Sequence, residues 1–367
     1  MSNICFVIGT RPEFIKIIEV VNELKNLSKY KIKIIFSSQQ NLLIKKYIDK
    51  KIFNYDMKIN KFNSDSGFIS SFLIKMEKLN KKIDIDYFFV QGDTNTAFAT
   101  SLFGFLKKIP IIHLEAGLRT YNLEQPYPEE FNRQSITKMA NIHLSQTLSS
   151  KQNLKKEGID KNIFVVGNPG IDYLCKVIKK NKIKEKVILN SILITMHRRE
   201  SLDGSLKLFV KNLKKFMKKN PHFKIFWPLH TNPNILKNIK DSFKSKENYN
   251  INFSEPMKYN EFLKILMSCE FVITDSGGIQ EEAAFLGKKL LIARDVTERI
   301  DILKLKLGYL IMADGSRLQQ TISSLKKKKI NKTTTLKWKK MQGNGKSSKK
   351  VLSIFRDQIK NLVNKNI

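Results

Sequence analysis

The strongest constraint on the fold is a pattern that runs the length of the chain, in which short apolar strands alternate with helices and many strands end in a polar turn. Six strands are predicted in the first half, at Asn3–Ile8, Ile32–Phe36, Tyr87–Val90, Ile109–His113, Ile142–Leu144 and Ile163–Val166. Five follow in the second half, at Ser191–Thr195, Lys224–Pro228, Tyr249–Phe253, Phe271–Thr274 and Lys289–Ala293. Continuous apolar strands between helices are typical of parallel sheets that are covered on both faces. The pattern therefore predicts two α/β domains of the Rossmann type.

The domain boundaries are predicted from turn residues and periodicity. The cluster Gly167-Asn168-Pro169-Gly170 is a strong turn signal. We expect an N-terminal domain over 1–168, a second domain over 169–348, and a helix with apolar periodicity over 349–367. The polar, lysine-rich stretch 326–348 is expected to be loop. Ligands of open α/β sheets bind beyond the carboxyl ends of the strands, so we expect the two domains to face one central cleft.

Charge is the most unusual feature of the composition. The formal net charge of the 367 residues is +34, which could indicate a nucleic-acid partner. However, lysines are spread over the whole chain, and no aromatic or Arg-rich patch interrupts them. We interpret the charge as a compositional drift toward lysine and expect no nucleic-acid partner.

Other bulk features indicate a cytoplasmic protein. No apolar run is long enough to span a bilayer, so no membrane insertion is expected. The N-terminus lacks the features of a signal peptide. The three cysteines lie far apart in apolar surroundings, which favours buried thiols in a reducing compartment.

The drift toward lysine makes the arginines informative, because only nine of the 67 basic residues are arginine. Arginine offers a planar, forked donor for phosphate that lysine cannot copy. Seven arginines fall in turn-rich segments near predicted strand ends: Arg11, Arg119, Arg133, Arg198, Arg199, Arg294 and Arg299. They indicate an anionic ligand.

Two turns have the character of phosphate sites. Asp275–Glu282 follows a strand and opens a helix, with Gly277 and Gly278 at the point where helix N–H groups are free to bind phosphate. Ser276 can add a hydroxyl donor, and Glu282 could accept two ribose hydroxyls. The matching turn of the first half, Gly9–Glu13, carries Arg11 but lacks the G-x-G-x-x-G dinucleotide fingerprint.

Acid–base chemistry is indicated by three carboxylates at or just beyond strand ends, Asp93, Glu115 and Glu129. Like charges in a cleft raise one another's pKa, which suits a base and an acid acting on a carbon–hydrogen bond. For Asp93 the alternative is an Asx-turn or a helix cap. His197 and His230 follow two strands of the second half, and His230 could protonate a leaving phosphate. No Cys or His spacing fits a metal.

Taken together, these segments resemble the non-hydrolysing UDP-N-acetylglucosamine 2-epimerases. The matching stretches occur in the family's order and cover most of the chain: GTRPEFIK (9–16), QGDT (91–94), HLEAGLRT (113–120), PYPEEFNR (126–133), GNPGID (167–172), TMHRRES (195–201), HTNP (230–233), DSGGIQEEA (275–283) and RDVTER (294–299). This chain departs from the family at Ser38-Gln39-Gln40, where many members have Gly-Gln-His in a region that binds a second, activating UDP-GlcNAc.

The resemblance implies a GT-B fold and the interconversion of UDP-GlcNAc and UDP-ManNAc. The family's route eliminates UDP to give a 2-acetamidoglucal and adds UDP back, without nicotinamide, metal or other cofactor. By resemblance, the catalytic residues are Asp93, Glu115, Glu129 and His230. The residues that bind the UDP-sugar are Arg11, Lys16, Arg133, His197, Ser276, Gly277, Gly278, Glu282 and Arg299. We expect a homodimer that makes precursors for a surface polysaccharide.

Three alternatives from other classes remain open at the level of sequence. A related UDP-2-acetamido sugar, such as a 6-deoxy or 2,3-diacetamido form, could be the substrate. A hydrolysing relative would release free ManNAc, and a GT-B glycosyltransferase would require an acceptor. The segments Gly9–Glu13 and Glu129–Arg133 favour the non-hydrolysing branch.

Overall fold

The computed structural model contains two compact units, each built on its own parallel sheet. It describes residues 1–39, 48–59, 64–196, 204–229, 239, 241–243, 249–357 and 359. The first unit comprises Met1–Tyr173 and Met341–Ile367, and the second comprises Leu174–Lys340. The α/β class and the pair of Rossmann-like units predicted from the sequence are confirmed, while the finer division at residues 168 and 348 stays a prediction.

The first unit has seven parallel strands in the order β3-β2-β1-β4-β5-β6-β7. The strands are β1 Ser2–Ile8, β2 Tyr30–Phe36, β3 Tyr55–Asp56, β4 Tyr87–Gln91, β5 Ile111–Ala116, β6 Ile142–Ser145 and β7 Ile163–Val165. The helices are α1 Arg11–Leu24, α3 Asp65–Asn80, α4 Asn95–Leu106, α5 Glu129–Met139, α6 Leu148–Lys156 and α15 Ser347–Asp357. Helix α7 spans Pro169–Lys180, where the chain leaves this unit.

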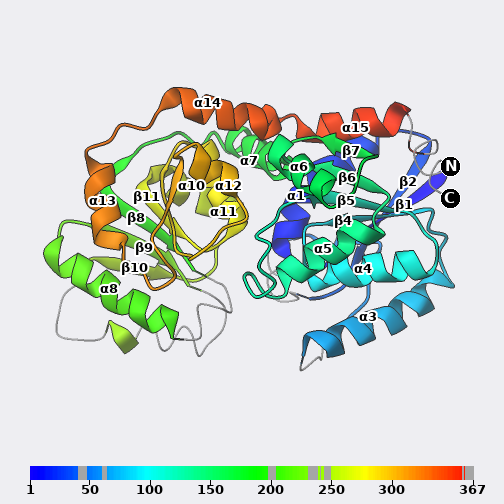
Figure 1. The fold of residues 1–367 in the computed structure, drawn as a ribbon, viewed down its shortest axis with the longest axis horizontal. Helices are drawn as coiled ribbons and strands as arrows, with labels where there is room; N and C mark the ends of the chain where they lie inside the picture. The colour runs from blue at the N-terminus through cyan, green and yellow to red at the C-terminus, as the bar shows by residue number, and fades with distance from the viewer. Residues whose placement is uncertain are drawn as a thin grey trace. The chain divides into compact units, whose positions relative to one another are not determined.

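Both faces of this sheet are covered, as continuous apolar strands require. Helices α1 and α15 pack on the face that carries Ile4, Phe6 and Ile8. Helices α3 and α4 cover the opposite face at Cys5 and Val7, and α5 joins them farther along the sheet. In Figure 1, α3, α4 and α5 accordingly lie on the other side of this sheet from α15, drawn in red. The last described helix therefore completes the core of the first unit.

The second unit has six parallel strands in the order β10-β9-β8-β11-β12-β13. The strands are β8 Ile188–Thr195, β9 Lys224–Pro228, β10 Ile251–Ser254, β11 Cys269–Thr274, β12 Lys289–Ile292 and β13 Gly308–Leu310. The helices are α8 Ser205–Lys219, α10 Tyr259–Ser268, α11 Gly277–Phe285, α12 Ile300–Lys304, α13 Leu318–Lys326 and α14 Lys332–Met341. Helices α8 and α13 bury apolar faces against one side of the sheet, and α10 and α11 pack on the other (Figure 1).

One expectation about order was wrong. The stretch 326–348, expected to be loop, contains α14 and a 3-10 turn at Gly343–Gly345. Among the side chains of α14, Trp338 and Thr335 are buried, and the Trp338 indole donates a hydrogen bond to the carbonyl of Glu281. Only two of the ten residues of α14 have buried side chains, and lysines and threonines make up most of the others, so the apolar period is too weak to recognise in the sequence. No helix in the described ranges is long and apolar enough to cross a membrane.

Candidate active site

The strand order places the predicted site residues at the switch point of each sheet. In the first sheet the order reverses between β1 and β4, and in the second between β8 and β11. Ligands of open α/β sheets bind beyond the carboxyl ends of the strands at such a point. The turn with Arg11 follows β1, the turn with Asp93 follows β4, and the turn with Ser276 follows β11. The first two turns therefore mark the candidate site residues of the first unit, and the third marks those of the second unit.

The turn after β1 is held by the side chains of its own helix start. Thr10 is the N-cap of α1 and its hydroxyl accepts the N–H of Glu13, while the Glu13 carboxylate accepts the N–H groups of Thr10 and Gly9 at 2.7 and 2.9 Å. This is a capping box. Arg11 is the first residue of the helix and is half-buried. All the capping residues are thus close in sequence, and they fix the start of α1 at Arg11.

Glu13 also reaches a second turn, which we did not predict. Its other carboxylate oxygen accepts a hydrogen bond of 2.7 Å from the Thr94 hydroxyl, in the turn after β4. The side chain is 1% exposed. Burial raises the pKa of Glu13 to about 7, although the hydrogen bonds to it act in the opposite direction. The T-x-x-E spacing of Thr10 and Glu13 is typical of a capping box, but this spacing does not indicate a contact with Thr94.

Asp93 lies in the turn after β4, directly before the N-cap of α4, which is Thr94. Its carboxylate pairs with the Arg133 guanidinium at 3.1 Å, and its backbone carbonyl accepts 2.9 Å from the Asn132 side chain. The preceding Gly92 has φ +68° and its carbonyl lies 2.8 Å from Nε2 of His113. Asp93 is therefore not the cap itself, and its carboxylate faces a predicted site residue, Arg133.

Glu115 is placed differently from expectation. It lies inside β5, which continues past His113 to Ala116, and its φ is +71°. The pairing of β5 with β6 shifts register between Leu114 and Ala116, so Glu115 is the extra residue of a bulge. A left-handed conformation at a non-glycine residue is uncommon and typical of functional sites. The bulge turns the carboxylate toward the carboxyl ends of the strands.

Two donors hold the Glu115 carboxylate. Lys16 forms an ion pair with it from α1, and the Gln91 side chain donates to the same oxygen from the end of β4. All three side chains are largely buried. Lys16 and Glu115 were both predicted as site residues, whereas Gln91 was not. In the sequence, Gln91 is a polar amide at the end of an apolar strand, directly before the Gly92-Asp93-Thr94 turn. This position could have indicated a role in the site.

Glu129 and Arg133 lie one turn apart on α5. Glu129 is the first residue of α5, and Arg133 lies one turn later on the same face, where it contacts Asp93. The neighbouring Glu130 has a structural role, because its carboxylate is fully buried and accepts from Thr120 N, Tyr121 N and the side chains of Arg133 and Gln134. The three predicted carboxylates thus belong to the turn after β4, to β5 and to α5 of one unit.

His113 is structural. It is fully buried, and desolvation lowers its pKa to about 3. The ring is therefore neutral at physiological pH. Its Nε2 lies within hydrogen-bond distance of the Gly92 carbonyl, so the proton sits on Nε2 and the ring supports the turn that carries Asp93.

The turn after β11 is built around backbone and an arginine. Ser276 is the N-cap of α11 and forms no side-chain cap hydrogen bond, and Gly277 and Gly278 are the first two helical residues. A Cβ on Gly277 would lie 2.5 Å from Cζ of Arg299, so the guanidinium rests against this glycine. Gly278 has no atom within 4 Å of such a position. The first N–H groups of α11 thus lie next to the Arg299 guanidinium.

Two buried carboxylates orient Arg299. Glu281 accepts from its Nε at 3.0 Å, and Glu298 pairs with its Nη1 while also accepting 2.7 Å from Arg294. Glu282, predicted to bind ribose, accepts 2.7 Å from the Tyr259 hydroxyl. The structure therefore brings Ser276, Gly277, Gly278 and Arg299 together at one helix start. Glu281 was not predicted, because its partner Arg299 lies 18 positions away in sequence, and Glu298 was not predicted although its partners Arg294 and Arg299 are close in sequence.

Two predicted residues, His197 and His230, lie outside the described residues. Within the described part of the chain, no group of three or more His, Cys, Asp or Glu side chains could hold a metal ion.

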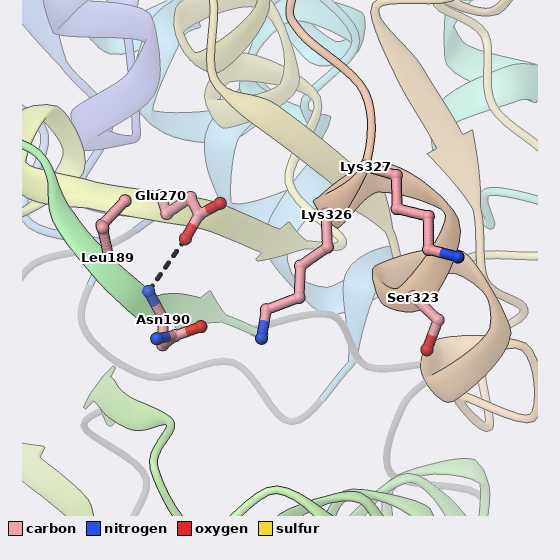
Figure 2. A pocket seen from close by; sticks show the side chains of 6 residues that line it. All are labelled: Leu189, Asn190, Glu270, Ser323, Lys326 and Lys327. Carbon is pink, nitrogen blue, oxygen red and sulfur yellow. Dashed lines mark hydrogen bonds between the residues drawn. The ribbon is translucent and has the colours of Figure 1, made fainter.

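A cavity of about 470 Å³ lies elsewhere in the second unit and is lined by Leu189, Asn190, Glu270, Ser323, Lys326 and Lys327. Figure 2 shows the Glu270 carboxylate turned toward the backbone N–H of Asn190, a hydrogen bond of 2.8 Å. Leu189 and Asn190 begin β8 and Glu270 begins β11. The cavity therefore lies at the amino ends of these strands, opposite the switch point.

Two Rossmann-like units, each with a parallel sheet and polar turns at its switch point, place the protein in the GT-B fold class. The model of one family, described as UDP-N-acetylglucosamine 2-epimerase, matches residues 14–356. The chain therefore belongs to the UDP-N-acetylglucosamine 2-epimerase family, as the resemblance of its motifs predicted.

Individual relatives agree with this assignment. A UDP-N-acetylglucosamine 2-epimerase of Salmonella borreze is 35% identical over 376 residues, which cover 97% of this chain and 98% of the relative. The crystal structure of UDP-GlcNAc 2-epimerase from Neisseria meningitidis bound to UDP-GlcNAc aligns with a TM-score of 0.86 and 32% identity over 97% of this chain and 100% of that one. The Methanocaldococcus jannaschii UDP-GlcNAc 2-epimerase in complex with UDP-GlcNAc and UDP aligns with a TM-score of 0.84 and 28% identity, over 97% and 100%.

Proposed function

We propose that the protein is a non-hydrolysing UDP-GlcNAc 2-epimerase that interconverts UDP-GlcNAc and UDP-ManNAc. The observation that carries the proposal is the carboxylate set of the first unit. Asp93 and Glu115 stand after or within neighbouring strands, each held by a cationic side chain that the family motifs also include. Charged groups in such fixed pairs are the parts that proton transfer at a carbon centre requires.

The start of α11 is the proposed site of the UDP diphosphate. Free helix N–H groups and a positive dipole end attract phosphate. Arg299 adds a forked donor that Glu281 and Glu298 hold in place. Arg11 is proposed to contribute a second guanidinium from the first unit. Gly277 and Gly278 allow the phosphate to approach the backbone because neither carries a Cβ.

The reaction is proposed to proceed by elimination and re-addition. A base removes the proton from C2 of the sugar, the C1–O bond to UDP breaks with its electron pair, and a C1–C2 double bond forms. UDP then adds back to C1 while an acid delivers a proton to the opposite face of C2. UDP is both the leaving group and the returning nucleophile, so no redox cofactor enters the balance.

The proton-transfer roles are proposed for Asp93, Glu115 and Glu129. Lys16 and Gln91 restrict Glu115 to one orientation, and Arg133 does the same for Asp93. Side chains fixed before the substrate arrives contribute to the rate because little reorganisation remains. His230 is proposed to assist the departure of UDP, in line with its position in the family motif.

Location, assembly and cellular role are part of the same proposal. We propose a cytoplasmic homodimer that supplies an amino-sugar nucleotide for a surface polysaccharide. Light scattering of the purified protein would measure the mass, which should be close to twice the 42.6 kDa of one chain.

The test of the reaction uses UDP-GlcNAc in D2O. Proton NMR should show UDP-ManNAc with deuterium at C2 and no free ManNAc. Asp93→Asn, Glu115→Gln and Glu129→Gln should each lower kcat by about 100-fold or more, the usual range for general acid–base catalysis, while UDP affinity by calorimetry changes far less. Product without C2 deuterium, or full turnover in all three variants, would contradict the proposal. Turnover of 6-deoxy or 2,3-diacetamido UDP-sugars in preference to UDP-GlcNAc would redirect it to those substrates.

A further inference from the structure

The Glu13 carboxylate uses its two oxygens on two different turns. Oε2 accepts from Gly9 N and Thr10 N, in the turn after β1. Oε1 accepts from the Thr94 hydroxyl, in the turn after β4. A capping box needs only the bond to the N-cap N–H. The bond to Thr94 therefore exceeds what the start of α1 requires.

The two turns carry different parts of the proposed chemistry. Arg11 directly follows Thr10, and Asp93 directly precedes Thr94. The strands that lead into them, β1 and β4, are neighbours across the switch point of the sheet. Glu13 thus links the turn of a proposed UDP-binding residue to the turn of a proposed proton-transfer residue.

Close packing makes this link rigid. A Cβ on Gly9 would overlap Thr96 Oγ1 and would lie 2.5 Å from Ser37 Oγ. Thr96 belongs to the first turn of α4. The backbone of the turn after β1 therefore packs directly against the start of α4. Side-chain volume cannot be added between them.

The chemistry of this contact requires a carboxylate. The Thr94 hydroxyl oxygen accepts the N–H of Ala97 as the cap of α4, so its own hydrogen is directed to Glu13. On the other side Glu13 meets two N–H donors. A glutamine at this position has one acceptor oxygen and could satisfy only one side. The charged group is buried with three donors around it, which is the arrangement that offsets part of its desolvation.

We propose that Glu13 is a positioning residue, which holds the Asp93 turn in a fixed register with the Arg11 turn. It does not touch the substrate and acts through Thr94 and the backbone of residues 92–94. This inference rests on the proposed epimerase function. A shift of about 1 Å in a catalytic group can cost up to about 100-fold in rate, so a loosened turn should affect turnover before it affects binding.

The experiment is a double-mutant cycle on turnover of UDP-GlcNAc, with C2 deuterium incorporation, KM, UDP affinity and melting temperature recorded for each protein. Glu13→Gln can keep the capping box but loses the second acceptor. It should lower kcat by about 10- to 100-fold, with KM and UDP affinity changed by less than about threefold. Thr94→Val breaks the same bond from the other side and should cause a similar loss, whereas Thr94→Ser keeps the hydroxyl and should retain most of kcat.

The double variant separates positioning from general damage. Because both single changes remove one shared bond, the double variant should be about as slow as the slower single variant. Losses in kcat that multiply would overturn the proposal. So would variants that lose melting temperature but turn over normally.

Thr147→Val is the matched control, because Thr147 is the N-cap of α6 and accepts from Ser150 N in the same manner. Its melting temperature should fall by a few degrees, as the loss of an N-cap predicts, with unchanged kcat. If the wild-type protein itself lacks epimerase activity, the proposed function fails. If the wild type is active and Glu13→Gln is equally fast, only the role of Glu13 fails.

Discussion

The turns after β1 and β11 both join a central strand to a helix, yet they satisfy their backbone groups in opposite ways. The β1 turn is closed, because Thr10 and Glu13 accept the N–H groups of Gly9, Thr10 and Glu13. The β11 turn is open, because the N-cap Ser276 forms no side-chain cap bond and two glycines follow it. A closed turn can offer a ligand only its side chain, here Arg11. An open turn can offer its backbone N–H groups as well.

The glycines of the two turns mirror this difference. Gly9 is glycine because protein atoms fill the space of its missing side chain, and those atoms belong to Ser37 and Thr96. Gly277 faces the guanidinium of Arg299, and a Cβ on Gly278 would have no described atom within 4 Å outside its chain neighbours and the backbone of its own helix. The first glycine thus serves packing, whereas the other two keep space for a ligand and its arginine.

Gly9→Ala should produce the largest effect. The added Cβ would overlap two side-chain oxygens in a fully packed region, and overpacking of this kind typically costs about 1–3 kcal/mol or more. We expect a fall of several degrees in melting temperature or failure to accumulate folded protein. A variant as stable as the wild type would mean that the closed turn has room to relax, and the contrast with the open turn would weaken.

Gly277→Ala should weaken UDP binding and also lower stability, because two buried carboxylates hold the Arg299 guanidinium where the new Cβ would lie. The Cβ would displace the Arg299 guanidinium from the helix start, and loss of one charge-assisted contact corresponds to about 10-fold or more in affinity. Isothermal titration with UDP measures this.

Gly278→Ala is the matched control for Gly277→Ala, since a Cβ there would have no atom of the described residues within 4 Å outside its neighbours and its own helix backbone. It should melt at or above the wild-type temperature because alanine favours helix. Any loss of affinity in Gly278→Ala reports the ligand's own contact with the backbone. Equal UDP affinity in the wild type and both variants would remove the start of α11 from the site.

The last expected effect concerns pH and the closed turn. Burial raises the pKa of Glu13 to about 7 from 4.5, so between these values the folded state keeps a proton that the unfolded state releases. Stability from this group is therefore present at low pH and is lost as pH rises through 4.5 to 7. We expect urea unfolding to show that the free energy of unfolding of Glu13→Gln rises relative to that of the wild type between pH 5 and pH 8, by on the order of 2 kcal/mol. A difference independent of pH would show that Glu13 titrates normally.

Some parts of the site followed from local sequence alone. The spacing of Thr10 and Glu13 predicts a capping box, and glycines after an apolar strand predict an open helix start. The order of the family's motif residues predicted three further site residues, Lys16, Arg133 and Glu115. Gln91 and Glu281 were missed because their partners lie 24 and 18 positions away, where no local pattern indicates them. Glu298 was missed although its partners Arg294 and Arg299 are close in sequence, because their spacing does not show that Arg299 lies at the start of α11.

The sequence by itself determined the number of units, the parallel character of both sheets and the family, because hydrophobic period and motif order are local properties of the chain. Tertiary structure alone decided which strands are neighbours, and therefore that the turns of Arg11 and Asp93 meet at a switch point. It also decided the bulge that turns Glu115 inward and the bridge from Glu13 to Thr94. These features depend on pairing between segments that are distant in sequence, as Glu13 and Thr94, 81 positions apart, illustrate, and such pairing is set by the packing of whole elements.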